Sequence, residues 1–337
     1  MKKLIISALI FFAGSGVTLA QLGKLKIMEQ RQLNVNAESN FLVGVVKDAV
    51  FAEKGLIVID EADPKVLFIQ DNISQKIGNE GRGPMEYLEP TSVSVSNSKM
   101  ALLDKQLNRI SHFKFSDKMK SWDFENTLKL NLDISDVCEF KNQTFIYGLN
   151  ENGNIHKLTK NLSNIEYSVG KKNSEVLSKD LEKFNNGIIE CDENKLIIGL
   201  KNDNKVSVYS NLESNVSNSE IVFNEIVPLV SVIEKVGDRQ RIIKNYYSGE
   251  AYNENGKFHD LLTSVIGLSE KLFLIQYERS HKDAKDNEEF VMSFIVDIET
   301  EEYLVQKNLP IFKDVVDNKG IITKDNELYL VEFNINK

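Results

Sequence analysis

Short apolar runs recur along this chain, and each run begins just after a polar turn. The runs begin at six positions: Leu56, Met100, Thr144, Leu196, Leu272 and Leu328. Successive starts are 44, 44, 52, 76 and 56 residues apart. A strand–turn–strand unit that recurs at about this period is typical of a β-propeller, in which each blade is one small twisted sheet. The pattern therefore predicts an all-β fold, a six-bladed β-propeller.

The second unit shows the four strands of one blade most clearly. Residues 91–95 alternate as a half-buried inner strand, and residues 100–103 return as a fully covered strand. Residues 109–115 alternate again, and residues 121–130 supply an outer strand. β-Branched and aromatic residues fill these segments, and turn-forming residues separate them, as expected for short strands.

The last unit is too short for a complete blade. It contains two apparent strands, at residues 320–323 and 328–333, before the chain ends. We expect the N-terminal segment 25–35 to pair into this last blade, because closing the ring covers strand edges that would otherwise invite aggregation. The alternative is an N-terminal tail without fixed structure.

The gap of 76 residues between the fourth and fifth runs is longer than one blade needs. Apolar residues at helical spacing occur within residues 225–240. We therefore expect a small insertion near residues 225–245, with a short helix on one face of the propeller.

The N-terminus has the features of a secretory signal peptide. A basic start is followed by an apolar run over residues 4–12 and by the small residues of a cleavage site ending at Ala20. An uncleaved membrane anchor is the alternative. We expect residues 1–20 to be removed, leaving a single domain over residues 21–337 that is periplasmic or secreted. No later stretch approaches the 18 apolar residues of a membrane span, so no membrane insertion is expected after signal removal.

The chain is acidic, with a formal charge of −9. Removal of residues 1–20 takes away two lysines, which leaves 39 basic against 50 acidic residues and a charge of −11. An acidic chain without a basic block repels phosphate backbones, so nucleic acid is not expected as a partner. We expect a monomer whose charge keeps it in solution.

The two cysteines, Cys138 and Cys191, each lie just ahead of an apolar run. This places them near the ends of innermost strands in neighbouring blades. A disulfide is open to them in an oxidising compartment. However, strands of adjacent blades diverge, and Cα atoms more than about 7 Å apart cannot be bridged, so we favour two unpaired buried thiols.

Residues 66–115 resemble the NHL-type six-bladed propellers that bacteria, the Bacteroidetes in particular, export. That family has a glycine-rich connection followed by a hairpin with a D-x-x-x-x-RI-x-x-F pattern. The connection is matched by Gly81, Gly83, Pro84, Glu86, Tyr87 and Pro90, with Met85 in place of a second glycine; the hairpin is matched by Asp104, Arg109, Ile110 and Phe113. The resemblance implies a propeller fold and export, and it implies little about activity because most of the family has no known function.

Several of these residues also have structural roles that follow from their backbone and side-chain chemistry. Gly81 and Gly83 allow positive φ, and Pro84 fixes the next φ, as a connection between two blades requires. Asp60 and Asp104 stand at equivalent places, four residues after their apolar runs begin. We expect each carboxylate to accept backbone N–H groups of a turn, with ligand contact as the alternative.

Signals for catalysis or metal binding are absent from the sequence. The histidines His112, His156, His259 and His281 stand far apart, and two of them are expected in third strands, as surface or packing residues. An acidic stretch over residues 283–289 lacks the spacing of a calcium-binding loop, and its pattern favours a solvated hairpin tip. No nucleophile-elbow pattern occurs. No cofactor, metal ligand or catalytic residue is therefore predicted.

Binding is the remaining class of function. The connections between blades and the turns between second and third strands share one face of a propeller. The candidate ligand or partner residues on that face are Arg82, Asp104, Arg109, Tyr277, Arg279 and His281. Ordinary solvated loop residues are the alternative. The single tryptophan, Trp122, is expected in an outer strand, where packing between blades is favoured over a sugar platform.

The sequence thus predicts an exported, non-catalytic propeller that recognises a protein partner or a polar small ligand on its loop face. One alternative is a metal-dependent propeller hydrolase or lyase of the lactonase or amidating-lyase kind, with carboxylates or histidines around one ion. A second alternative is a structural module of a cell-envelope assembly, which would have no concave polar pocket.

Overall fold

The structure is a computed structural model, and every element in its described part is a β-strand. The described residues are 22–33, 44–63, 65–70, 73–140, 143–150, 153–159, 164–169, 186–192, 195–201, 203–210, 219–226, 258–281, 290–324 and 327–336. The signal-peptide residues 1–20, residues 227–245 of the expected insertion and the acidic stretch 283–289 lie outside these ranges.

The first three blades follow one another along the chain, each as a four-stranded antiparallel sheet. Blade 1 comprises β2 (Val46–Ala52), β3 (Gly55–Asp60), β4 (Lys65–Gln70) and β5 (Ile73–Ile77). Blade 2 comprises β8 (Pro90–Ser96), β9 (Lys99–Asp104), β10 (Arg109–Ser116) and β11 (Ser121–Lys129). Blade 3 comprises β12 (Asp133–Phe140), β13 (Gln143–Asn150), β14 (Gly153–Leu158) and β15 (Ile165–Val169). A small parallel pair, β6 (Asn79–Glu80) and β7 (Glu86–Tyr87), lies in the connection between blades 1 and 2.

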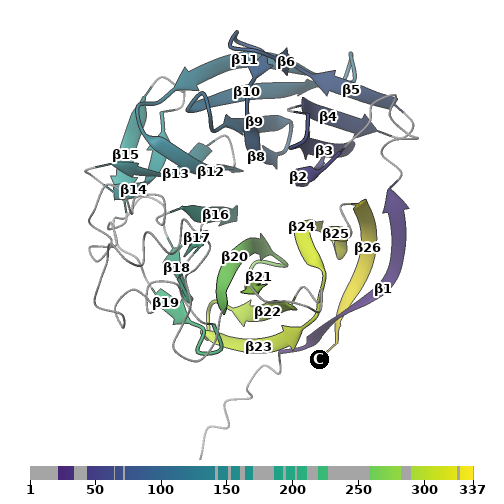
Figure 1. The fold of residues 1–337 in the computed structure, drawn as a ribbon, viewed down its shortest axis with the longest axis vertical. Coiled ribbons are helices and arrows are strands. Elements are labelled where there is room, and N and C mark those ends of the chain that lie inside the picture. Colours follow the sequence, from purple (N-terminus) through teal and green to yellow (C-terminus); the bar gives the residue numbers. More distant parts are fainter. Residues whose placement is uncertain are drawn as a thin grey trace, which may run out of the picture.

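The other three blades complete a ring around a central axis (Figure 1). Blade 4 comprises β16 (Gly187–Asp192), β17 (Lys195–Leu200), β18 (Lys205–Ser210) and β19 (Ser219–Val222). Blade 5 comprises β20 (Phe258–Gly267), β21 (Leu272–His281), β22 (Phe290–Asp297) and β23 (Glu302–Lys307). Blade 6 comprises β24 (Ile311–Val316), β25 (Lys319–Lys324), β26 (Glu327–Asn336) and β1 (Lys24–Leu33). The predicted six-bladed propeller is confirmed.

The N-terminal strand closes the ring, as the sequence predicts. β1 is the outermost strand of blade 6 and pairs antiparallel with β26 from Lys24↔Asn336 to Leu33↔Leu328 (Figure 1). Gln306 of blade 5 adds two hydrogen bonds to the backbone of Leu25, whose side chain is buried. The first and last strands of the chain therefore share one sheet.

One detail of the periodicity differs from the sequence pattern. The first five apolar runs begin on the second strands of their blades, whereas Leu328 lies on β26, the third strand of blade 6. The shift arises because blade 6 takes its outermost strand from the N-terminus, so that the chain supplies only three strands at its end. The C-terminal sequence thus supplies three strands of the sixth blade, and the N-terminal strand β1 supplies the fourth.

The hydrophobic core is divided into clusters between neighbouring blades. In the described residues each of the six blade-to-blade contacts has its own cluster of buried side chains. Between blades 1 and 2, Trp122 packs against Phe68 and Phe115 with ring centroids 6.2 and 5.3 Å apart. Trp122 is buried, and its predicted role in packing between blades is confirmed.

Two histidines belong to this packing as well. His112 and His156 are buried in third strands, in blades 2 and 3. The ring nitrogens of His156 lie 2.7 Å from the hydroxyl of Ser168 and 2.8 Å from the carbonyl oxygen of Gly148. These contacts join β14 to β13 and β15. The burial of both histidines agrees with a packing position rather than a surface position.

The preference for two unpaired cysteines is wrong. Cys138 on β12 and Cys191 on β16 form a disulfide, with their Cα atoms 6.0 Å apart. The blades diverge toward the outside of the ring, but their innermost strands converge at the axis, where a backbone N–H of one strand reaches a side chain of the next. At that radius two Cα atoms fall within the range that a disulfide spans.

Candidate functional site: the central cavity

A cavity of about 840 Å³ occupies the centre of the ring. The innermost strands of all six blades line it, namely β2, β8, β12, β16, β20 and β24. Its lining extends from Glu61, at the end of β3, to Asn97, in the turn between β8 and β9 on the opposite face. Every blade thus contributes to the wall of the cavity.

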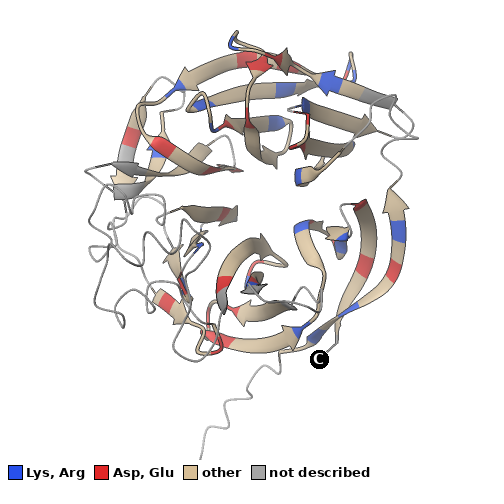
Figure 2. Ribbon diagram, viewed as in Figure 1, with Lys and Arg blue, Asp and Glu red and all other residues tan. Residues whose placement is uncertain are grey.

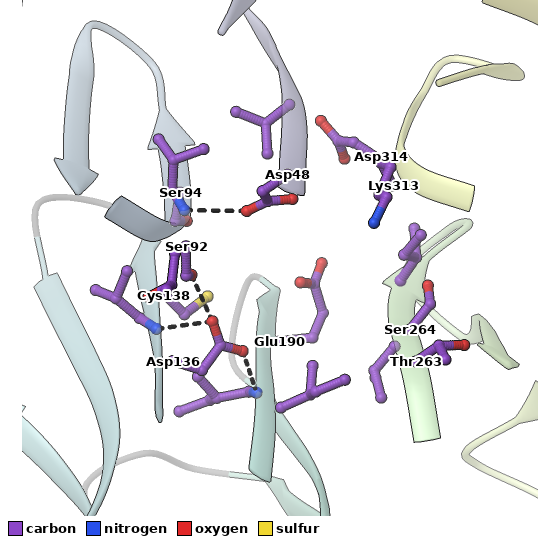
Figure 3. Close-up of a pocket in the computed structure, with 18 of the residues that line it drawn as sticks. Asp48, Ser92, Ser94, Asp136, Cys138, Glu190, Thr263, Ser264, Lys313 and Asp314 are labelled. Atoms are coloured by element: carbon purple, nitrogen blue, oxygen red, sulfur yellow. Dashed lines mark hydrogen bonds between the residues drawn. The ribbon is translucent and has the colours of Figure 1, made fainter. Parts of the chain in front are cut away.

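Five of the six innermost strands place a short polar side chain at the same position of the lining. The residues are Asp48, Ser92, Asp136, Ser264 and Asp314 (Figure 3). Each one follows a break in the pairing register with the second strand of its own blade. A β-bulge inserts one extra residue and re-aims the neighbouring side chain. The bulges therefore explain why otherwise apolar strands present polar groups to the axis.

The three aspartates fasten consecutive blades to one another. Asp48 accepts a hydrogen bond from the backbone N–H of Val93 in blade 2, at 3.1 Å. Asp136 accepts one from Ile189 in blade 4, at 2.8 Å, and Asp314 accepts one from Phe51 in blade 1, at 2.7 Å. The second oxygen of each carboxylate accepts the N–H of the residue that follows it.

Two serines add further hydrogen bonds between neighbouring blades. The hydroxyl of Ser92 donates to Asp136 at 2.5 Å and joins blade 2 to blade 3 (Figure 3). The hydroxyl of Ser264 donates to the carbonyl oxygen of Phe312 at 3.0 Å and joins blade 5 to blade 6. Blade 4 carries the apolar Ile188 in the cavity lining, and there a backbone bond from Leu262 to Lys201 makes the link to blade 5. Polar bonds thus run from blade to blade around the axis.

Burial changes the protonation of these carboxylates. The pKa of Asp314 is raised to about 7 and that of Asp136 to about 6, chiefly by burial and in smaller part by the negative charge of Asp48. Burial also raises the pKa of Asp48, against the opposing effect of Lys313. All three side chains remain half-buried because one side of each faces the cavity. Of these three residues, called the aspartate ring below, Asp136 and Asp314 are therefore partly protonated near neutral pH.

Three lysines share the cavity lining with these carboxylates. Lys47 forms an ion pair with Glu61 at 2.7 Å. Lys313 extends toward the middle of the cavity and donates to the carbonyl oxygen of Lys47 at 3.1 Å (Figure 3). Burial lowers the pKa of Lys313 and also that of Lys201, although part of the Lys201 side chain stays exposed. The cavity is thus of mixed charge.

The candidate residues predicted from the sequence lie elsewhere, and none of the five whose side chains the structure describes lines the cavity. Asp104 is fully buried and accepts the backbone N–H groups of Leu88, Glu89 and Leu107. Asp60 likewise accepts those of Gly44, Val45 and Ala62. The predicted turn-capping role of both aspartates is confirmed, and each carboxylate ties a connection between blades to the turn after a second strand.

Arg109 organises the connection between blades 1 and 2. Its guanidinium donates to the carbonyl oxygen of Gly83 at 2.7 Å and also bonds that of Glu86. In the same connection Gly78 and Gly81 have φ of 75° and 145°, and a Cβ on Gly81 would lie 2.2 Å from the Glu86 carboxylate. This packing holds the loop that presents the exposed side chain of Arg82.

The other three candidates belong to β21 of blade 5. Arg279 forms a bidentate ion pair with the buried Asp260, at 2.7 and 3.0 Å. Tyr277 is buried in the cluster between blades 4 and 5. His281 ends the strand, and its side chain lies outside the described part of the structure. Their contact with a ligand or partner stays a prediction.

The sequence analysis did not single out the aspartate ring or the equivalent positions on the other inner strands. A signal for it exists, because Asp48, Ser92, Asp136, Ile188 and Ser264 each stand eight residues before the start of an apolar run. Aligning the units on those starts would have shown a polar residue at one position in four of the five. The sixth member, Asp314, breaks the spacing because the last run begins on a third strand.

The described residues contain no group of three or more His, Cys, Asp or Glu side chains placed to hold a metal ion. The three ring aspartates therefore do not form a metal site of that kind, and each is directed toward backbone N–H groups instead. The described segments also hold no helix with the length and hydrophobicity that a membrane crossing requires.

Lysine and arginine residues are interspersed with aspartate and glutamate over the blades (Figure 2). In the view along the axis neither sign gathers on one blade. This distribution agrees with the absence of a basic block in the sequence.

The chain belongs to a family of six-bladed β-propellers. The DUF5128 family model, described as a 6-bladed beta-propeller, matches residues 20–232, more than half of the chain. None of the curated proteins matches the chain.

Among solved structures, a candidate exported protein of Bacteroides fragilis is similar, with a TM-score of 0.61 and 13% identity. The similarity covers 96% of this chain and 98% of that one. A protein of Lactobacillus plantarum aligns with a TM-score of 0.53 and 8% identity, over 88% of this chain and 86% of that one. At such identities the likeness concerns the fold alone.

Proposed function

We propose that this chain is an exported, non-catalytic propeller of the NHL type that binds a polar small ligand or a polar segment of a protein partner in its central cavity. The cavity of about 840 Å³, lined by charged and hydroxyl side chains from all six blades, is the observation that carries this proposal. Pockets of this size take small ligands, and a few polar groups in them fix the orientation of what is bound.

The loop face supplies the entrance in this proposal. The connections between blades and the turns after the second strands lie on one face, and Glu61 at the end of β3 belongs to the cavity lining there. Arg82 is exposed on a loop of that face, and Asp104 and Arg109 hold neighbouring loop backbone in place. Preorganised loops lose little conformational entropy when a partner binds, which favours recognition on this side.

Export is part of the proposal. It is supported by the signal-peptide features of residues 1–20 and by the disulfide between Cys138 and Cys191, since disulfides persist in oxidising compartments. The ring closure through β1 supports a single propeller domain over residues 21–337, since each of the six blades has four strands in the described residues.

Amide hydrogen exchange during a ligand screen tests the proposed site. Polar small molecules and peptide pools are ranked by their effect on thermal unfolding, and exchange is then mapped for each hit. A ligand of the proposed site increases protection along β2, β8, β12, β16, β20 and β24. Hits that protect only outermost strands would contradict the cavity as the binding site.

The metal-dependent enzyme is tested in the same experiment with a chelator. A native-state metal would add several degrees to the melting temperature by mass action, and a chelator would remove that gain. We expect the melting temperature to stay unchanged. A chelator-dependent fall together with lactone or ester turnover would favour the hydrolase or lyase instead.

A further inference from the structure

The cavity lining carries more negative than positive side chains. Its described carboxylates are Asp48, Glu61, Asp136, Glu139, Glu190, Glu278 and Asp314, and its basic residues are Lys47, Lys201 and Lys313. These side chains come from the inner strands of four blades and from the loop-face ends of three second strands. Low-dielectric walls focus the field of such groups into the enclosed space.

The lysines compensate only part of this charge. The ammonium of Lys47 is engaged by Glu61 at 2.7 Å. Burial lowers the pKa of Lys313, although the attraction of Asp48 opposes this effect, and Lys201 is affected by burial in the same direction. Asp136 favours the charged form of Lys201, while Lys105, Lys47 and Lys313 disfavour it, and the pKa of Lys201 is lowered overall.

The position of Lys313 indicates which kind of chemical group fits between the aspartates. Its alkylammonium extends from β24 into the cavity toward the side of Asp48 (Figure 3). The electrostatic attraction between Lys313 and Asp48 favours the charged form of each group. The chain thus places one tethered ammonium in a cavity large enough for further groups.

The ring aspartates retain capacity for a second cation. Each carboxylate oxygen has two lone pairs. The Asp314 oxygens accept one backbone N–H each, from Phe51 and Val315, and the Asp48 oxygens likewise accept one each. A cation in the cavity would meet the lone pairs that these backbone bonds leave open.

We propose that the ligand of the cavity presents an alkylammonium or guanidinium group to Asp48, Asp136 and Asp314, either as a free organic amine or as a lysine or arginine side chain of a partner. This inference rests on the proposed function and specifies the ligand of that site. Anionic ligands are disfavoured because they would meet an excess of carboxylates.

Proton release accompanies cation binding. A positive charge beside a carboxylate favours its ionised form. Burial raises the pKa of Asp314 to about 7 and that of Asp136 to about 6, so both hold protons at mildly acidic pH and must lose them when a cation arrives. Affinity for the cation therefore rises with pH across this interval.

Isothermal titration calorimetry tests the inference with putrescine, agmatine and N-acetyl-lysine amide as probes. A tripeptide Gly-Arg-Gly with blocked termini represents the partner side chain. The amides N,N′-diacetylputrescine and N,N′-diacetyl-lysine amide are neutral controls. We expect the charged probes to bind roughly tenfold or more tightly at about pH 8 than at about pH 5.5, with proton release seen in buffers of different ionisation enthalpy.

Variants separate the inference from general charge effects. Asp314→Asn and Glu190→Gln remove a cavity carboxylate and should weaken binding of the charged probes by roughly tenfold. Lys313→Met removes the tethered ammonium and should strengthen it by a similar factor. Asp133→Asn, an exposed change on the same strand as Asp136, is the matched control and should leave binding unchanged. Because Lys313→Met predicts a gain, misfolding cannot imitate the expected result.

The free-amine and side-chain sources differ in their results. Tighter binding of putrescine than of the tripeptide indicates a free amine, and the reverse order indicates a partner's basic side chain. Equal binding of the neutral amides, no gain in Lys313→Met, or no pH dependence would overturn the inference. If neutral or anionic probes bind and protect the inner strands, the proposed cavity site stands while its cation specificity falls.

Discussion

Single carboxylates organise much of this molecule, and they do so in two different environments. Asp60 and Asp104 sit at turns, where several backbone N–H groups converge on each of them. Burial raises the pKa of Asp60, but its hydrogen bonds, including one from Lys65, outweigh burial and lower that pKa overall. In the aspartate ring each carboxylate accepts only two backbone N–H groups, and burial prevails for Asp136 and Asp314.

Replacing Asp104 by alanine should destabilise the protein. Three backbone N–H groups would lose their acceptor in a fully buried position. Charged hydrogen bonds and stranded buried donors suggest a loss of about 3 kcal/mol in the free energy of unfolding. Urea unfolding measures it, with the exposed Asp123→Ala as control. A loss no larger than that of the control would refute this role of Asp104.

Asp314 and Asp60 should change the free energy of unfolding in opposite directions as the pH rises. The pKa of Asp314, about 7 in the folded protein, exceeds the ordinary aspartate value of 3.8, so the folded state holds the proton more tightly. The contribution of Asp314 to stability is fully present below about pH 4 and is lost as pH rises through about 7. Asp60, whose pKa is lowered, contributes above its unfolded pKa and loses that contribution in acid.

Urea unfolding at several pH values measures the Asp314 contribution. Asp314→Asn should make the free energy of unfolding fall less between about pH 5 and 8, by roughly 1–2 kcal/mol relative to wild type. Asp133→Asn should retain the wild-type slope. Parallel pH profiles for wild type and Asp314→Asn would show that this carboxylate ionises normally.

At the scale of the strands, the alternation of apolar and polar residues predicted which segments form paired strands. It did not predict the distances between blades. The apolar runs begin on second strands in five blades, as the four-strand pattern of the second unit indicates. The bulges in β2, β8, β12, β20 and β24 are not visible in that alternation, because each is one extra residue whose placement depends on the partner strand. The cavity lining therefore had to come from the structure.

The disulfide between β12 and β16 should stabilise the protein by joining two blades. It closes a loop over a sequence separation of 53 residues. The chain-entropy account gives about 4 kcal/mol for a loop of that length. The double variant Cys138→Ser, Cys191→Ser should therefore unfold at lower urea concentration than wild type.

Reduction supplies the control for this prediction. A reductant should bring wild type toward the stability of the double variant and should leave the variant itself unchanged. Free-thiol titration of the unfolded, unreduced protein should find no reactive thiol. Two thiols in that titration would show that the cysteines are unpaired.

At the scale of the whole molecule, the ring depends on one contact between distant parts of the chain. β1 covers the edge of β26, and without it blade 6 would expose a row of unpaired backbone groups. The pairing spans nearly the entire sequence, from Lys24 to Asn336. Contacts of such separation form only after the intervening blades have brought both ends together.

Removal of residues 21–33 should therefore cause association or unfolding. The exposed edge of β26 would pair with other copies, and Leu25 and Leu33 would no longer fill their buried positions. Size-exclusion chromatography with light scattering measures the outcome, and a chain that begins at Gly23 is the control. A monomeric truncated protein with wild-type melting would show that closure by β1 is dispensable.

The sequence by itself determined the class of fold, the number of blades and their closure, because these depend on the period of apolar runs and on unpaired strand edges. It also determined the turn-capping roles of Asp60 and Asp104, since those bonds are local to connections that the turn pattern marks. The tertiary structure alone decided what faces the axis. Asp48, Asp136 and Asp314 become one group, and Cys138 meets Cys191, only because six separate strands converge there, and no periodicity along a single strand encodes a distance between blades.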